Sequence, residues 1–281
     1  MGAVLLAAGR LRFYVGLTVL LSALGVGAVA VALALGWSVP GALLAYLLAQ
    51  GLTVLPALAV ARQQGLWPAG LRLRLSRLAV RQMGQYLLMA LSVLLFSKAV
   101  DFGVREVLIR TFSLAQTDLW QAVVKLSDNY TMVFSAVMGS VYYPRLAALS
   151  GQPTQRRQLV RTVLLLLAPA AALGLGLLWL LRHWLLPLLF TQSFAAAEFL
   201  LAPQLLSDWA KFLAWTLLFL LMAQAQVGRY VAVQAVAAGL LAALLAGLLP
   251  RYGLLGAPLA HAIKNVLLLL ACLWYFRREV F

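Results

Sequence analysis

Long apolar stretches recur along the whole chain, and short segments rich in glycine, proline or polar residues separate them. A helix of about 20 apolar residues crosses ~30 Å of hydrocarbon. The stretches therefore predict eight membrane-spanning helices, at 14–35, 39–61, 84–109, 119–147, 158–181, 197–225, 230–249 and 253–276. Turn signals support these limits, among them GWSVPG at 36–41, SGQPTQ at 150–155 and PRYG at 250–253.

The apolar stretches are continuous, whereas the strands of a transmembrane β-barrel alternate apolar and polar residues. The predicted fold class is therefore an all-α polytopic membrane protein. One charged stretch, residues 66–82, divides the spans into two before it and six after it. It carries leucines on one helical face and Arg74, Arg77 and Arg81 on another, which is typical of a helix on an anionic membrane surface. We expect three parts: two spans within 1–65, an amphipathic linker helix at 66–82 on the cytoplasmic side, and a six-helix lobe at 83–281.

The first nine residues, MGAVLLAAG, are apolar like the end of a span but too short to be one. We expect the chain to begin partway through a helix. The alternative is a signal peptide, with Arg10 and Arg12 as its basic part and 14–35 as its apolar part. That apolar part is longer than usual and leads directly into another span, which favours the first interpretation.

Composition agrees with a membrane location, because 64% of the residues are hydrophobic and only 10% are charged, against about 25% charged in soluble domains. A net charge of +15 would suggest nucleic acid in a soluble protein, but most of the basic residues fall in short loops at membrane boundaries. We therefore expect no nucleic-acid partner. Cys272 is the only cysteine, so no internal disulfide forms, and the two histidines lie too far from it for a metal site. We expect neither a metal nor a cofactor.

Arginines are distributed unequally between the two sets of alternate connections, with fourteen on one side and three on the other. Loops rich in Lys and Arg stay in the cytoplasm, so both ends of the bundle are expected there. The larger set is Arg10, Arg12, Arg62, Arg72, Arg74, Arg77, Arg81, Arg145, Arg156, Arg157, Arg161, Arg229, Arg277 and Arg278, and the smaller is Arg110, Arg182 and Arg251.

Charged residues also lie deep within the predicted spans, where each costs roughly 2.5–3.5 kcal/mol unless it has a partner or water. Four pairs share the spacing i and i+3, which places both members on one helical face. Two interpretations are open: local neutralisation that eases insertion, or a polar interior shared by several helices. The pairs are Lys98 with Asp101, Lys125 with Asp128, Asp208 with Lys211, and His261 with Lys264.

Three pairs of opposite sign on three helices favour the shared interior, because an isolated helix avoids the cost with leucine. Among these mid-depth residues four lysines outnumber three aspartates, and Arg105 lies nearby. Excess positive charge suits an anionic solute such as a phosphate group. The residues therefore predict a transporter with an anion-compatible cavity.

Five sequence blocks follow one another in an order and spacing that are specific as a set: LLMALSVLLF at 87–96, REVLIRTFS at 105–113, WQAVVKLSDNY at 120–130, YYPRLAAL at 142–149 and LLSDWAKFLAW at 205–215. In these blocks the chain resembles the Wzx-type lipid-linked oligosaccharide flippases of the multidrug/oligosaccharidyl-lipid/polysaccharide exporter superfamily. The resemblance implies two six-helix lobes around a central cavity that opens alternately to each side. The eight spans would be family helices five to twelve: a complete C-terminal lobe and two helices of an N-terminally truncated first lobe.

The resemblance implies transport and not an enzymatic reaction. The implied substrate is an undecaprenyl-pyrophosphate-linked glycan, moved from the cytoplasmic to the periplasmic leaflet of the bacterial inner membrane. Such a glycan serves surface polysaccharide assembly, either O-antigen or enterobacterial common antigen. Beyond the bilayer, the implied partners are a polysaccharide polymerase and a chain-length regulator.

Arg105 and Lys125 lie on the two spans that the family places at the cavity, and we expect them to attract the pyrophosphate. Arg105 offers a planar fork and Lys125 a point charge. The alternative for Arg105 is snorkelling to the membrane interface. Further expected substrate contacts are Lys98, Trp120 and Tyr130, with interfacial anchoring as the alternative for Trp120.

The other ionisable residues are expected to pair charges or to couple transport to protons. Asp128 would hold Lys125 in place or carry a proton, while Asp208 and Lys211 either couple transport or brace the lobe. His261 is a candidate proton site, with a packing role as the alternative. The whole set is Asp101, Asp128, Asp208, Lys211, His261 and Lys264.

Three other functions remain as alternatives. A drug/cation antiporter of the same superfamily would need an acidic surplus in its cavity, and this chain has a basic one. A membrane-embedded prenyl or glycosyl transferase usually needs clustered carboxylates for metal and diphosphate, and the seven acidic residues form no DxxD cluster. A non-transporting membrane subunit is compatible with the missing helices.

Overall fold

The computed structural model describes residues 11–52, 54–63, 77–149 and 151–277, and every regular element within these ranges is a helix. The all-α fold class predicted from the apolar stretches is thereby confirmed. The helices group into two compact units, Met1–Arg74 and Leu75–Phe281, and the boundary falls inside the charged stretch at 66–82.

The N-terminal unit consists of α2 (Leu11–Ala34), α3 (Val39–Leu52) and α4 (Val54–Gln63). Gly36 turns the chain between α2 and α3 with a φ of 75°, which glycine adopts without strain. The two helices approach closely at Gly25, where a Cβ atom would lie 2.7 Å from the Tyr46 ring. The span predicted at 39–61 is helical on both sides of residue 53, as α3 and α4.

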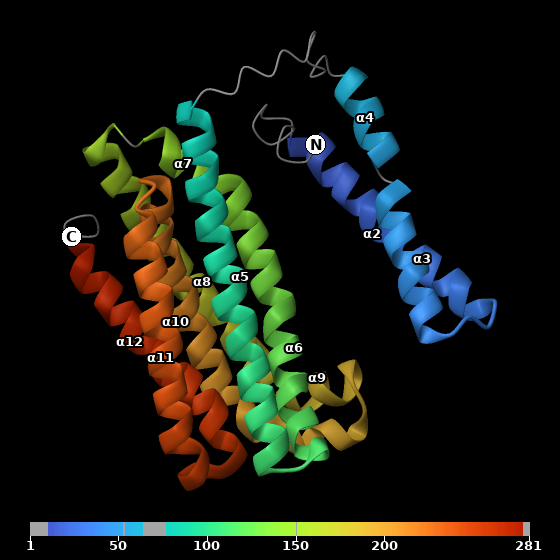
Figure 1. The fold of residues 1–281 in the computed structure, drawn as a ribbon. Coiled ribbons are helices and arrows are strands. Elements are labelled where there is room, and N and C mark those ends of the chain that lie inside the picture. The colour runs from blue at the N-terminus through green and yellow to red at the C-terminus, as the bar shows by residue number, and fades with distance from the viewer. Residues whose placement is uncertain (1–10, 53, 64–76, 150, 278–281) are drawn as a thin grey trace. The chain divides into compact units, whose positions relative to one another are not determined.

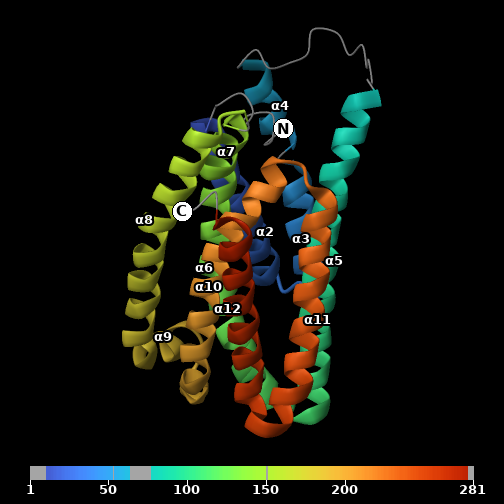
Figure 2. The same cartoon turned by 90° about the vertical axis from the view of Figure 1, so that its left-hand side faces the viewer.

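The C-terminal unit is an up-and-down bundle of six long helices that follow one another in chain order (Figures 1 and 2). Short helices form parts of its connections. The long helices are α5 (Arg77–Thr111), α6 (Leu114–Val137), α8 (Pro153–Leu180), α10 (Glu198–Ala223), α11 (Val227–Tyr252) and α12 (Gly256–Tyr275). The short ones are η1 (Met138–Tyr142), α7 (Tyr143–Ala148), α9 (Arg182–Leu189), η2 (Gln192–Ala197) and η3 (Gly253–Leu255).

Six stretches of the described residues are long and apolar enough to cross a membrane, and one of them contains both α11 and α12. Together they cover seven of the eight predicted spans. The remaining predicted span, 119–147, is helical as expected, but α6 within it carries Asp118, Lys125 and Asp128 and is not among the six apolar stretches. The chain is therefore a multi-pass helical membrane protein.

α10 is the central helix of the C-terminal unit. In the most apolar stretch of α10, 67% of the residues are buried, against 11% in that of α8. α10 packs against α6, α8, α11 and α12. Ala210 and Ala214 on α10 are fully buried, and their small side chains let neighbouring helices approach closely, as small residues do in membrane bundles. The core of the unit therefore surrounds the helix that carries Asp208 and Lys211.

α5 has 35 residues and is about 52 Å long, so it extends beyond a ~30 Å hydrocarbon layer. Its first six residues, 77–82, are the end of the predicted linker helix and continue directly into the span. The rest of that predicted helix, 66–76, lies outside the described residues, as does the nine-residue N-terminal stretch.

Eight of the twelve described arginines of the C-terminal unit lie in elements that meet at one end of the bundle, the end at the top of Figure 1. That end holds the start of α5, the α7–α8 and α10–α11 connections and the end of α12. Alternate connections thus lie at the same end of the bundle, as expected from the order of the spans. The cytoplasmic location of the arginine-rich end stays a prediction. Its arginines are Arg77, Arg81, Arg145, Arg156, Arg157, Arg161, Arg229 and Arg277, and those of the opposite end are Arg110, Arg182 and Arg251.

The predicted span at 119–147 is not one uniform helix. Five residues, Met138–Tyr142, form a π-helical turn between α6 and α7. Pro144 follows in the first turn of α7, and proline both lacks an N–H and clashes with the carbonyl four residues earlier. The wider turn accommodates this clash, and the Ser140 hydroxyl donates a hydrogen bond to the Ala136 carbonyl at 2.6 Å.

Candidate functional site

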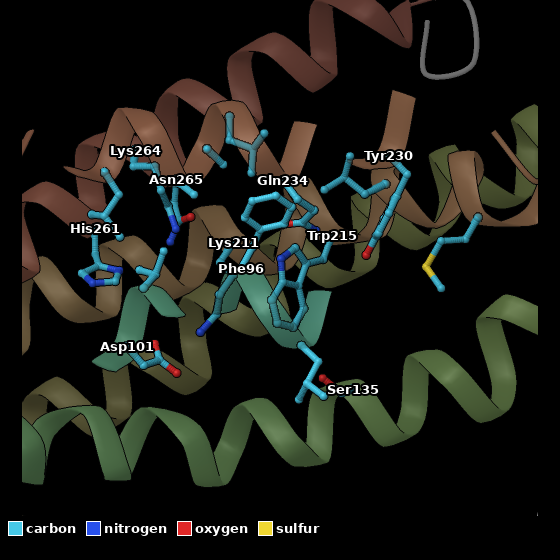
Figure 3. Close-up of a pocket in the computed structure, with 18 of the residues that line it drawn as sticks. Phe96, Asp101, Ser135, Lys211, Trp215, Tyr230, Gln234, His261, Lys264 and Asn265 are labelled. Atoms are coloured by element: carbon cyan, nitrogen blue, oxygen red, sulfur yellow. The ribbon is translucent and has the colours of Figure 1, made fainter. Parts of the chain in front are cut away.

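A cavity of about 570 Å³ lies among five helices of the C-terminal unit: α5, α6, α10, α11 and α12. Its walls are mostly apolar, as expected inside a membrane bundle, but polar and charged side chains from all five helices also line it. Figure 3 shows Lys211 and His261 reaching from their helices toward the turn of α5 that carries Asp101. The polar lining is Asp101, Ser135, Lys211, Tyr230, Gln234, His261, Lys264 and Asn265.

Asp208 on α10 is completely buried behind this cavity and is satisfied by hydrogen bonds. Its Oδ2 accepts from the hydroxyls of Ser127, at 2.6 Å, and Tyr130, both on α6. The side-chain amide of Gln204, one turn earlier on α10, donates to both carboxylate oxygens at 3.3 Å. A buried carboxylate needs such partners, because an unpaired one would cost several kcal/mol.

Lys211 neutralises Asp208 and also faces the cavity. Its Nζ lies 2.6 Å from Asp208 Oδ1 and donates a second hydrogen bond, of 3.0 Å, to Thr131 on α6. The ammonium is 5.6 Å from the ring centre of Trp215, within the range of a cation–π contact. The pair with its α6 partners therefore links α6 to α10, which agrees with the bracing role considered for it.

Lys264 and His261 are one turn apart on α12 and line the same cavity. Within the part of the chain that the structure describes, neither side chain has a hydrogen bond or an ion pair with another residue. Asp101, across the cavity, pairs with Lys98 at 3.5 Å, and Asp208 pairs with Lys211. Lys264 is therefore the positive charge that these two aspartates leave uncompensated.

Asn265 fixes the face that α12 presents to the cavity. It is buried, and its amide donates to the hydroxyl of Ser207 at 2.8 Å and to the Ser207 carbonyl at 3.2 Å. Because Asn265 directly follows Lys264, this link to α10 also sets the direction in which Lys264 leaves the helix. The amide can donate these bonds only where α10 and α12 are in close contact.

The other two predicted pairs, on α5 and α6, are mostly exposed, and of their four members only Asp101 lines the cavity. Lys98 and Asp101 are 72% and 55% exposed, and Lys125 and Asp128, 4.0 Å apart, are 69% and 61% exposed. Arg105 is also exposed, one turn after Asp101. The structure thus brings Asp101, Lys211, His261 and Lys264 together in one cavity, and leaves Lys98, Arg105, Lys125 and Asp128 outside its lining.

Two aromatic residues lie differently from what was expected of them. Trp120 was expected to meet a sugar ring or the membrane interface, but it is only 5% exposed and packs in a core cluster with Leu186 and Leu200. The side of α6 that carries Trp120 faces α10, which explains this burial. Tyr130, expected to contact substrate, is half-buried and uses its hydroxyl on Asp208.

Sequence reasoning missed the uncharged polar residues around Asp208 and Lys264. These are Ser127, Thr131, Gln204, Ser207 and Asn265. Some signal was available: Gln204 precedes Asp208 by one helical turn, and Asn265 adjoins Lys264. Uncharged polar residues are common in membrane helices, however, so their spacing alone does not identify a hydrogen-bonded cluster.

The chain is similar to two curated proteins, the lipid III flippases of Escherichia coli (strain K12) and Shigella flexneri. Each is 28% identical over 237 residues, which make up 84% of this chain and 57% of the relative. The chain thus spans a little over half the length of these relatives. No family model matches it, and no solved structure matches it. The similarity confirms the resemblance to Wzx-type flippases indicated by the five sequence blocks.

Proposed function

We propose that this chain acts in the translocation of an undecaprenyl-pyrophosphate-linked oligosaccharide across the bacterial inner membrane, from the cytoplasmic to the periplasmic leaflet. The observation that carries the proposal is a cation-rich cavity inside a membrane bundle whose sequence is similar to lipid III flippases. A pyrophosphate is the charged part of such a substrate, and it needs compensating cations wherever it leaves water.

Lys264 is the cavity residue best suited to attract the pyrophosphate. Its ammonium has no bonded partner among the described residues, whereas Lys211 is held by Asp208 at 2.6 Å. An anion that enters the cavity would therefore gain a charge partner at Lys264 without first breaking an ion pair. Lys211 adds a second positive charge nearby, and Gln234 and Tyr230 on α11 offer hydrogen-bond donors.

Arg105 and Lys125 remain proposed pyrophosphate contacts of a different kind. Both lie outside the cavity lining, on exposed faces of α5 and α6. We propose that they meet the substrate at the surface of the six-helix unit and that the cavity lysines meet it within. Lys98, paired with Asp101, would join them on α5.

The substrate class follows from the same relatives. Between O-antigen and enterobacterial common antigen, similarity to lipid III flippases favours a lipid III-type glycan. We propose a non-enzymatic transport role, with a polysaccharide polymerase and a chain-length regulator as partners in assembly. The runner-up, an antiporter of organic cations, would need an acidic surplus, and the lysines of the cavity disfavour it.

A binding experiment tests the proposal. The purified chain in lipid nanodiscs is titrated with undecaprenyl-pyrophosphate-linked oligosaccharide and, separately, with the same glycan on undecaprenol without phosphate, and complexes are counted by native mass spectrometry. We expect the pyrophosphate form to bind at least about tenfold more tightly, because one compensated charge is worth ~1.4 kcal/mol or more. Equal binding of the two forms would overturn the proposal.

A variant pair sharpens the test. Lys264→Gln should lower affinity for the pyrophosphate form by about tenfold. Arg110→Gln is the matched control, since it also removes one cation. Arg110 lies outside the cavity lining, exposed in the last turn of α5, where it pairs with Glu106 at 2.7 Å. We expect the control to bind like the unchanged chain. If both variants lose affinity equally, net charge and not the cavity explains binding.

A further inference from the structure

A second hollow lies beside the charged cavity, between α5 and α11. It has a volume of about 550 Å³, and its lining is apolar apart from Thr111. Its space comes from small side chains on the two facing helices, Ala99 and Gly103 on α5 and Ala242 and Ala246 on α11. We call this hollow the α5–α11 groove.

The α5–α11 groove adjoins the charged cavity directly. Four residues line both hollows: Phe96 and Val100 on α5, and Ala238 and Leu241 on α11. From this shared wall the groove follows α5 as far as Thr111, and 15 residues of helix correspond to about 22 Å. One end of a long apolar groove thus meets a cation-rich cavity.

Such a juxtaposition fits an amphiphile with one anionic end. The shared wall lies near the middle of α5, and Lys264 lies near the middle of α12, so the cationic end is far from either membrane surface. An ordinary phospholipid keeps its phosphate at the surface, about 15 Å from the centre of a ~30 Å hydrocarbon layer. Only a lipid whose phosphate is brought into the bundle can fill both hollows at once.

We propose that the α5–α11 groove holds the prenyl chain of the diphosphate lipid whose head binds in the charged cavity. The inference rests on the proposed function and adds to it a site for the lipid part of the substrate. The prenyl chain moves into the groove from hydrocarbon and not from water, so the groove adds affinity through close van der Waals packing against α5 and α11. The two hollows then act as one binding site, with the diphosphate at Lys264 and the chain along α5 and α11.

The groove can be filled from the protein side without disturbing the backbone. A Cβ atom on Gly103 would meet nothing within 4 Å, so Gly103→Leu extends into open space. Ala242→Leu does the same from the opposite wall, where Ala242 is exposed. Matched controls are Gly84→Leu, on α5 with equal free space, and Ala243→Leu, next to Ala242 on α11, and neither position lines a hollow described above.

The test compares two probes, undecaprenyl diphosphate and inorganic diphosphate, for binding to the full chain in nanodiscs. We expect Gly103→Leu and Ala242→Leu, which occupy the space of the chain, to weaken binding of undecaprenyl diphosphate about tenfold and to leave binding of inorganic diphosphate unchanged. Lys264→Gln should weaken both probes, and the two controls should weaken neither. Unchanged affinity for undecaprenyl diphosphate in both groove variants overturns the groove, while a failure of the unchanged chain to bind either probe overturns the proposed function.

A second measurement does not depend on the folding of any variant. An undecaprenyl diphosphate with a photoreactive group on its chain should label the stretch 238–249 of α11 and the stretch 96–107 of α5 upon irradiation. Labelling spread over all lipid-exposed helices would show that the chain stays in the bilayer. Retention of ordinary phospholipid that Gly103→Leu abolishes would show an acyl chain in the groove, and either result overturns the inference.

Discussion

The ammonium of Lys211 lies 2.6 Å from the carboxylate of Asp208, one turn earlier on the most buried helix of the bundle. The side chains are 17% and 1% exposed, so both charges are withdrawn from water and from lipid headgroups. Lys98 with Asp101 and Lys125 with Asp128 have the same spacing, but their side chains are more than half exposed. Equal spacing in the sequence therefore corresponds to two different energetic situations.

Breaking the buried pair on one side should be costly. Asp208→Asn leaves Lys211 without its counter-charge, and loss of one partner from a buried pair costs about 3–5 kcal/mol. We expect a large fall in the thermal midpoint of the purified chain, followed by the fluorescence of a dye that reacts with Cys272 on unfolding. The double variant Asp208→Asn with Lys211→Met should recover much of the loss. A double variant as unstable as the sum of its parts would show that the two charges do not compensate each other.

An exposed pair supplies the control for that experiment. Glu106 and Arg110 are 2.7 Å apart with side chains 42% and 78% exposed. Exposed ion pairs contribute about 0–1 kcal/mol, so Glu106→Gln should change the thermal midpoint little.

Lys125 should matter for substrate and not for folding. Lys125→Ala should lower binding of the pyrophosphate-linked glycan, while Lys125→Arg should retain part of it because the charge persists in a different geometry. The double change of Lys125 and Asp128 to Ala should insert into membranes as well as either single change, since their side chains are mostly exposed. Binding is followed by native mass spectrometry and membrane abundance by immunoblot. Unchanged glycan binding in the double variant would remove Lys125 from the site.

Gly256 should be essential for the packing of α11 on α12. A Cβ atom there would lie 2.6 Å from the carbonyl oxygen of Leu248, a backbone atom that cannot move aside. Gly256→Ala should therefore destabilise the unit by roughly 1–3 kcal/mol. Gly247→Ala is the matched control, because its Cβ would meet nothing within 4 Å and alanine favours a helix by up to ~1 kcal/mol. The order of the two thermal midpoints checks the prediction.

The arginine-rich end of the bundle should face the cytoplasm. A reporter fused after Phe281 is expected to register as cytoplasmic, and one inserted at Gln192, in the connection at the opposite end, as periplasmic. Reversed signals at both positions would show that the orientation is inverted.

The helices were predictable because hydrocarbon thickness sets their length, and the described residues of each of the eight predicted spans are mainly helical. Finer features were not predictable. The π-helical turn at Met138–Tyr142 accompanies a nearby proline, Pro144, but the sequence does not say how the backbone relieves the clash that this proline causes.

The candidate site was only partly predictable for a related reason. The i, i+3 spacing places two charges on one face, but which face meets other helices depends on tertiary packing. Asp208 and Lys211 face α6, whereas Lys125 and Asp128 on α6 point away from the bundle. Trp120 is a further example, because its apolar ring suits a membrane surface and a core equally. Only the packing of α6 on its neighbours places this ring in the core.

The hydrogen bonds around α10 have a mechanical consequence. Side-chain bonds join α10 to α6 through Asp208 and Lys211, and to α12 through Asn265. Among the side chains that the structure describes, those of α5 bond only within α5, and α5 packs chiefly on α11 through apolar contacts. The trio α6, α10 and α12 is a stiff frame, and α5 is its least tethered wall. A molecule that enters the bundle from the side would therefore meet least resistance by displacing α5 relative to α6, α10 and α12.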